Sequence, residues 1–159
     1  MKNRLRNMFA TGLIAAAILM AIGYNVVIAQ DGRGGQTLVG TWQTVVTPRD
    51  CATGAPSPNS FPGILTFNHG GTMTGTSTAV SSVYGIWDRT PGPHVYSFLS
   101  VSQRFAAGPV PVYLGTRRIT QNVTVGGDTF TSEGSFTDTN PAGTTVASGC
   151  STSVGTRLQ

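Results

Sequence analysis

A series of turn sequences interrupts this chain at short intervals and leaves room only for short strands between them. Each turn contains glycine or asparagine, which tolerate a positive φ, or proline, which cannot continue a β-ladder. The segments between the turns are rich in β-branched and aromatic residues, and after residue 29 no window shows a helical apolar period of 3.6 residues. The turn sequences are Asn68-His69-Gly70-Gly71, Thr90-Pro91-Gly92-Pro93, Gly108-Pro109, Gly126-Gly127-Asp128 and Asn140-Pro141-Ala142-Gly143.

This pattern predicts an all-β fold. The expected strands cover residues 37–47, 62–68, 72–79, 82–89, 94–106, 111–125, 128–138 and 144–157. Connections of hairpin length favour an antiparallel up-and-down meander of eight strands, and closing it into a barrel removes both exposed edges. A two-sheet β-sandwich is the alternative, because turn spacing alone does not separate the two. We expect residues 37–159 to form a single domain.

The first 29 residues have the three parts of a secretory signal peptide. Three basic residues precede an apolar stretch over residues 8–28, and Ala29 supplies a small residue before the predicted cleavage point. Cleavage would leave residues 30–36 as a flexible N-terminus and place the chain in the periplasm or outside the cell, with no membrane attachment. The apolar stretch approaches the ~20 residues of a membrane-spanning helix, so a retained anchor is the alternative.

Loss of the signal removes most of the positive charge. The full chain has 10 Lys and Arg against 6 Asp and Glu, a net charge of +4. Without its three N-terminal basic residues the chain keeps seven arginines against six acids. These arginines are scattered, whereas a nucleic-acid-binding protein needs a basic patch or stripe. We therefore expect no nucleic-acid partner.

Cys51 and Cys150 are the only cysteines. An exported chain meets oxidising conditions, so a disulfide is predicted, with free thiols as the alternative. In a closed up-and-down barrel the first and last strands are antiparallel neighbours, and paired residues share a constant index sum. The sums for Cys51 with Cys150 and for Trp42 with Arg157 differ by 2, so both pairs fit one seam that contains a slip or a bulge.

The sequence Gly40-Thr41-Trp42, on the first predicted strand, resembles the Gly-x-Trp motif of the calycins, which include lipocalins, fatty-acid-binding proteins and avidins. In that superfamily the tryptophan plugs one end of the barrel and an arginine from the last strand packs over it. The resemblance implies that Gly40, Trp42 and Arg157 form this barrel-closing motif, in which a guanidinium stacks on an indole. The chain is also similar to small secreted β-proteins of bacteria, a resemblance that implies no activity.

No pattern indicates catalysis or metal binding. The sequence Gly-x-Ser-x-Gly is absent, and His69 and His94 lie in predicted turns without the spacing of a metal-binding pair. Asp128, Glu133 and Asp138 share one hairpin arm, but Glu133 faces away from the other two on a regular strand. We therefore predict no catalytic residues, no metal and no cofactor.

The long predicted strand over residues 111–125 gives the strongest indication of a binding site. Tyr113, Arg117 and Gln121 share one face with apolar residues, whereas the opposite parity would bury Arg118 and Asn122. Buried polar groups are costly unless they are paired or meet a ligand, which suits a pocket for a molecule with an anionic or carbonyl end. A solid core is the alternative. The candidate ligand-binding residues are Trp87, Tyr96, Phe98, Tyr113, Arg117 and Gln121.

Three functional hypotheses follow. The first is a non-enzymatic barrel that binds a small, mostly apolar ligand. The second is a structural or protein-interaction domain of the cell envelope with a filled core. The third is a barrel enzyme that resembles allene oxide cyclases or dirigent proteins. A hollow, partly polar interior favours the first or third, and an exposed apolar patch favours the second.

Overall fold

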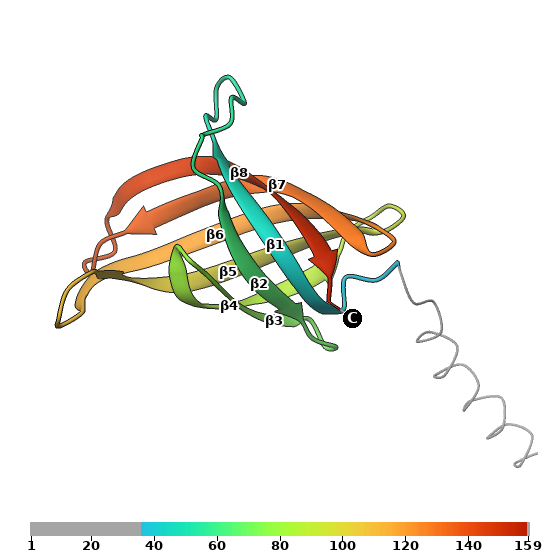
Figure 1. The fold of residues 1–159 in the computed structure, drawn as a ribbon, viewed down its shortest axis with the longest axis horizontal. Helices are drawn as coiled ribbons and strands as arrows, with labels where there is room; N and C mark the ends of the chain where they lie inside the picture. The colour runs from blue at the N-terminus through green and yellow to red at the C-terminus, as the bar shows by residue number, and fades with distance from the viewer. Residues whose placement is uncertain (1–35, 159) are drawn as a thin grey trace, which may run out of the picture. The chain divides into compact units, whose positions relative to one another are not determined.

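The computed structural model describes residues 36–158, and the predicted signal peptide and residues 30–35 lie outside this range. Eight antiparallel strands follow one another in chain order around a closed barrel (Figure 1). This confirms the predicted all-β up-and-down barrel over the sandwich. The strands are β1 Gly40–Arg49, β2 Phe61–Phe67, β3 Thr72–Ser77, β4 Val80–Arg89, β5 Val95–Ala106, β6 Val112–Gly126, β7 Thr129–Thr139 and β8 Thr145–Arg157.

The predicted strand boundaries agree with the observed ones to within three residues, and the largest difference is at the start of β1. The strand begins at Gly40 rather than at residue 37, because residues 37–39 turn across the barrel end. There Leu38 is fully buried, and the carbonyls of Thr37 and Val39 face Arg157.

Alternation along each strand separates the inside of the barrel from the outside. On β6 the side chains of Gln121, Val123 and Val125 are buried, whereas Asn122 and Thr124 between them are exposed. Because side chains alternate with a period of two, a slip by one residue would expose this apolar set. Burial therefore fixes the register of the strand.

Aromatic side chains fill one end of the barrel. Trp42 is fully buried and meets Phe130 edge-on with ring centres 5.1 Å apart. Phe67 lies between Phe130 and Phe98, with ring centres at 6.4 and 5.7 Å. A side chain at Gly155 would collide with the Phe130 ring, so glycine makes room for the aromatic residue on the neighbouring strand. At this end the barrel therefore has the solid core that was the alternative to a ligand pocket.

Arg157 closes the same end from β8. Its Cζ lies 4.1 Å from the centre of the Trp42 ring system, and its Nη1 and Nη2 donate to the carbonyls of Val39 and Thr37 at 2.6 and 2.7 Å. The Trp42 indole N–H donates to the Leu38 carbonyl at 2.8 Å. This arrangement is compatible with the end of a calycin-like barrel.

Gly40 is required by this closure. Its φ is +130°, and a Cβ there would lie 2.6 Å from Nη1 of Arg157. Any other residue would strain the backbone and displace the guanidinium. The glycine of the Gly-x-Trp motif therefore makes space for the arginine that covers the tryptophan.

Replacing Arg157 with lysine should destabilise the barrel. The ammonium keeps the charge but cannot reach two carbonyls in a planar fork, so we expect a loss of about 1–3 kcal/mol in the free energy of unfolding. Urea denaturation followed by tryptophan fluorescence measures this loss. The exposed Arg118 provides the control, since R118K should change stability by less than about 0.5 kcal/mol. Equal stability of the two variants would contradict the closing role.

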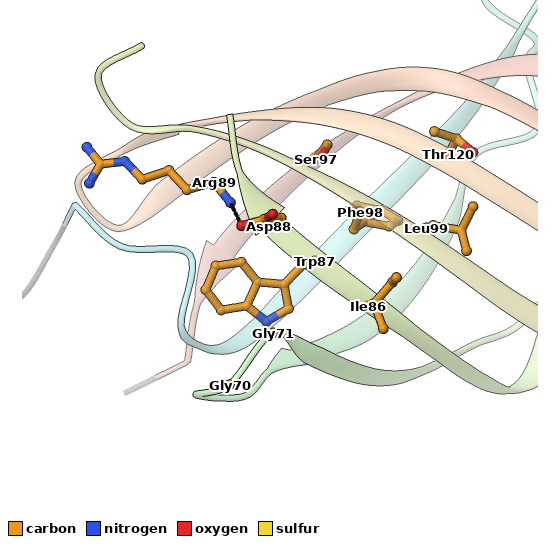
Figure 2. Close-up of a pocket in the computed structure, with 10 residues that line it drawn as sticks. All are labelled: Gly70, Gly71, Ile86, Trp87, Asp88, Arg89, Ser97, Phe98, Leu99 and Thr120. Atoms are coloured by element: carbon orange, nitrogen blue, oxygen red, sulfur yellow. Dashed lines mark hydrogen bonds between the residues drawn. The ribbon is translucent and has the colours of Figure 1, made fainter. Parts of the chain in front are cut away.

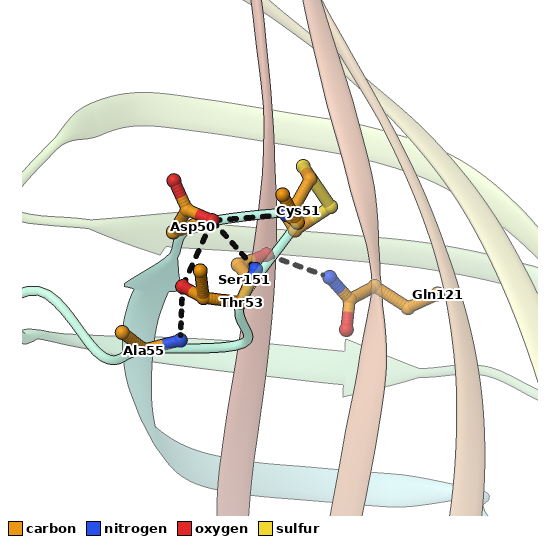
Figure 3. The surroundings of a disulfide bond; sticks show 8 residues. Asp50, Cys51, Thr53, Ala55, Gln121 and Ser151 are labelled. Carbon is orange, nitrogen blue, oxygen red and sulfur yellow. Dashed lines mark hydrogen bonds between the residues drawn. A yellow bond between two sulfur atoms is a disulfide. The ribbon is translucent and has the colours of Figure 1, made fainter.

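The first and last strands meet in the predicted seam. Trp42 pairs directly with Arg157, and Arg49 at the end of β1 pairs with Cys150. Cys51 lies two residues further on, in the turn after β1, and forms the predicted disulfide with Cys150 at a Cα–Cα distance of 5.2 Å (Figure 3). The difference of 2 between the index sums therefore arises because Cys51 lies beyond the strand, and the seam needs no bulge.

Loss of the disulfide should lower stability without changing the fold. The bond joins cysteines 99 residues apart, and cross-links of this span contribute about 2–5 kcal/mol by restricting the unfolded chain. A double variant, C51S with C150S, should unfold at lower urea concentration by this amount. Far-ultraviolet circular dichroism should still report native strand content, because the seam keeps its ladder. An unchanged unfolding midpoint would show that the bond adds nothing to stability.

Candidate ligand cavity

The half of the barrel away from Trp42 is hollow. A cavity of about 190 Å³ lies inside it, and side chains from all eight strands line the wall. It lies toward the end that carries the β1–β2, β3–β4, β5–β6 and β7–β8 connections. The lining residues are Thr44, Val46, Pro48, Phe61, Leu65, Thr76, Ser77, Ala79, Val80, Val83, Phe98, Ser100, Arg117, Ile119, Gln121, Phe136, Ser151 and Ser153.

The cavity has a polar wall on one side. Gln121 is 2 % exposed, and its Nε2 donates to Oγ of Ser151 at 2.9 Å (Figure 3). Within residues 36–158 the Oε1 of Gln121 has no hydrogen-bond partner. A buried amide oxygen without a hydrogen bond costs free energy. A ligand that donates a hydrogen bond to this oxygen would remove that cost. Gln121 is therefore the strongest polar candidate in the cavity wall.

Arg117 lies nearer the rim and is held by two groups. Its Nε and Nη2 donate to the two carboxylate oxygens of Asp138 at 2.7 and 2.8 Å, and its Cζ lies 4.5 Å from the centre of the Phe136 ring. Asp138 is 2 % exposed, and a buried carboxylate is costly without a paired cation such as this guanidinium. The paired strands β6 and β7 place Arg117 directly opposite Asp138.

A second arginine approaches the same carboxylate from β5. The Nε of Arg104 lies 3.3 Å from Oδ2 of Asp138. Arg104 lines a more open depression of about 670 Å³ that shares Ala79, Val80 and Arg117 with the cavity. The rim thus connects the interior cavity to an outer depression that carries positive charge.

Three of the six candidate ligand-binding residues, Phe98, Arg117 and Gln121, line the cavity. Tyr96 belongs to the sealed end, where its hydroxyl donates to the Gln36 carbonyl at 3.2 Å. Tyr113 is 41 % exposed and packs against Phe105 outside the barrel. Its face differs from the expected one because the ladder between β5 and β6 shifts register next to Gly115, where φ is +114°.

Trp87 also lies away from the cavity. Its indole N–H lies 3.0 Å from the carbonyls of both Asn68 and Thr72, and the ring borders a shallow depression of about 660 Å³ with Ile86 and Asp88 (Figure 2). Within that depression Oδ1 of Asp88 accepts a hydrogen bond from the Arg89 backbone N–H. The depression lies along β4 and β5 and is more open than the interior cavity.

Sequence reasoning did not single out Arg104 or Ser151, and it considered Asp138 only as a catalytic acid. A usable signal was present for Asp138. The turn Gly127-Asp128 sets the register of the β6–β7 hairpin, and residues equally distant from it pair, which brings Arg117 to Asp138. The approach of Arg104 to Asp138 could not be predicted in this way, because the β5–β6 ladder shifts register next to Arg104.

The loop after β1, at the cavity end of the barrel, is ordered around Asp50. Its Oδ1 accepts hydrogen bonds from the backbone N–H of Thr53 at 2.7 Å, from the Thr53 hydroxyl at 2.9 Å and from the N–H of Ala52 at 2.9 Å (Figure 3). The Thr53 backbone bond is the largest of the causes that hold the pKa of Asp50 below its ordinary 3.8. The charged carboxylate therefore organises the turn that presents Cys51.

The carboxyl of Asp50 should titrate below pH 3.8 in the folded protein. Because the folded pKa is the lower one, the stabilisation of this turn is complete above the unfolded pKa and disappears as pH falls through the folded pKa. Side-chain NMR of the carboxyl carbon measures the midpoint. T53V removes the hydroxyl bond and should move the midpoint toward 3.8, whereas an unperturbed midpoint in the natural chain would contradict the turn geometry.

Within the described range, no group of three or more His, Cys, Asp and Glu could hold a metal ion. His69 and His94 lie in turns, and Nδ1 of His94 is 3.1 Å from the Gln36 carbonyl. Residues 36–158 include no helix of a length and hydropathy suited to crossing a membrane.

Comparisons of the chain with protein-family models, curated proteins and solved structures gave no match. The calycin resemblance therefore rests on the eight-stranded closed barrel and on the arrangement of Gly40, Trp42 and Arg157 at its sealed end. These features are compatible with a calycin-like fold.

Proposed function

We propose that this protein is an exported, calycin-like barrel that binds a small, mostly apolar molecule in its interior. The observation that carries the proposal is the cavity of about 190 Å³, which is closed at one end by the aromatic core and lined mainly by apolar side chains. Ligand sites are concave, mostly apolar and equipped with a few polar groups, as this cavity is with Gln121 and Ser151.

The size of the cavity limits the ligand. Sites for drug-sized ligands usually have volumes of ~300–1000 Å³. The cavity, at about 190 Å³, is smaller than these sites. A ligand therefore either is smaller than this class or extends past Arg117 into the outer depression. Of the lining side chains only Arg117 is ionisable, and it is paired with Asp138, so binding is a simpler function for this wall than acid–base chemistry.

Export is part of the proposal. The Cys51–Cys150 disulfide is typical of oxidising compartments, and the N-terminal 29 residues have the order of charge and hydropathy of a secretory signal. A periplasmic or extracellular carrier would meet its ligand there. The intact mass of the exported protein tests cleavage after Ala29 and the loss of two hydrogens on disulfide formation.

One observation favours a second candidate, a protein-interaction domain. Tyr84 and Ile86 on the outer face of β4 are 66 % and 61 % exposed, and their direct neighbours on β5 are Val101 and Leu99. An exposed apolar patch of this kind is typical of contact surfaces. Binding inside the barrel and contact through β4 and β5 use opposite faces of the sheet, so each can be tested without the other.

A matched pair of variants tests the cavity. V46W fills the chamber from β1, whereas V45W places the same side chain on the outer face, where Val45 is 49 % exposed. The neutral fluorescent probe N-phenyl-1-naphthylamine should bind the natural chain. Its affinity should fall by about tenfold or more in V46W and change by less than about twofold in V45W.

Native mass spectrometry adds an independent measurement. A native mass that exceeds the denatured mass by a discrete few hundred daltons would reveal a co-purified ligand, and V46W should lose it. Failure of the neutral probe to bind, or equal binding by both variants, would show that the interior is not a binding site.

A further inference from the structure

We propose that the barrel selects organic anions: Arg104 and Arg117 hold one acidic group at the rim while the apolar body of the ligand lies in the cavity. The inference rests on the proposed function and adds the chemical class of the ligand. It comes from the imbalance of charge around Asp138.

Two guanidinium groups share one carboxylate at this rim. Arg117 bonds both oxygens of Asp138, and Arg104 approaches Oδ2 at 3.3 Å. The side chains of the arginines are about a quarter exposed, at 24 % and 25 %, whereas that of Asp138 is 3 % exposed. The cluster therefore has a net charge of +1, and its two arginines are more accessible to solvent than its carboxylate.

Within residues 36–158 no carboxylate other than Asp138 forms an ion pair with Arg104 or Arg117. Asp50 is occupied by its own turn, and Glu133 is exposed on the outer face of β7. Asp138 alone would satisfy one arginine, so the second arginine brings repulsion between like charges without a second acid to offset it. A structural ion pair needs only one of the two, which points to a role for the surplus charge.

Neither arginine uses all of its donors on Asp138. Arg117 uses Nε and Nη2 on Asp138, and Arg104 contacts it through Nε. To the backbone and to the described side chains, neither Nη1 of Arg117 nor either Nη atom of Arg104 donates a hydrogen bond. Guanidinium forks match carboxylate and related oxyanions, and charge-assisted bonds of this kind are the strong ones.

The position of the two arginines fits an amphipathic ligand. Arg117 borders both the cavity and the outer depression, and Arg104 borders the depression. The two spaces also share Val80 and Ala79, which give an apolar path between them. An acidic group held at the arginines would therefore place its attached apolar body against Phe136 and the chamber behind it.

Two probes with the same aromatic body test this inference. The anionic 8-anilinonaphthalene-1-sulfonate differs from N-phenyl-1-naphthylamine only by its sulfonate group. We expect the anion to bind about tenfold more tightly at low salt, and this preference should shrink as added salt screens the partly exposed arginines. V46W should weaken both probes, which ties the fluorescence to the cavity rather than to the outer face.

Variants of two arginines separate the possible outcomes. R104Q should remove most of the preference for the anion and leave the affinity for the neutral probe within about twofold, whereas R104K should keep part of the preference. R118Q removes an exposed outward-facing arginine from the same end of β6 and should change neither affinity. Unchanged affinity for the neutral probe in R104Q also shows that the variant folds.

Each result decides one question. Equal affinity for the two probes in the natural chain, or a preference that survives R104Q, would overturn the role of the arginines and leave the cavity as a neutral binding site. Failure of both probes to bind would overturn the proposed function and this inference together.

Discussion

The stacking of Arg157 on Trp42 is the interaction on which the rest of the barrel depends. It connects the last strand to the first and, through two carbonyl contacts, fixes the segment that precedes β1 across the barrel end. The aromatic core then packs against Trp42 from inside the barrel, beginning with Phe130. Because one end is closed in this way, any molecule that enters the interior must do so from the opposite end.

The two halves of the barrel differ because side-chain size changes along the inward-facing positions. On β5 these positions run from Tyr96 and Phe98 at the sealed end to Ser100 and Ser102 toward the other. On β8 serines at 151 and 153 likewise face the interior. Close packing needs large side chains to fill the cross-section of eight strands, and serine cannot do so. A single barrel is therefore solid at one end and hollow at the other.

Much of the architecture could be predicted from turn chemistry. Glycine, proline and asparagine at short intervals divide the chain into strands, and the Gly127-Asp128 turn even determines that Arg117 faces Asp138. The candidate site was less accessible. Phe98, Arg117 and Gln121 follow from alternation, but Tyr113 leaves the interior because a bulge changes its face. Trp87 and Tyr96 point inward yet belong to the sealed end, and alternation carries no information on depth along the barrel axis.

The sequence by itself predicted the number of strands, their up-and-down order and the disulfide, since these depend on local turns and on the export signal, while the calycin resemblance implied that Trp42 meets Arg157. Only the tertiary structure decided where the barrel is hollow and that Arg104 joins Arg117 at Asp138. Both depend on how eight separate strands superimpose their side chains in one cross-section. Which side chains share a cross-section depends on the register of every strand pair and on every bulge around the barrel. No single segment of the chain therefore determines it.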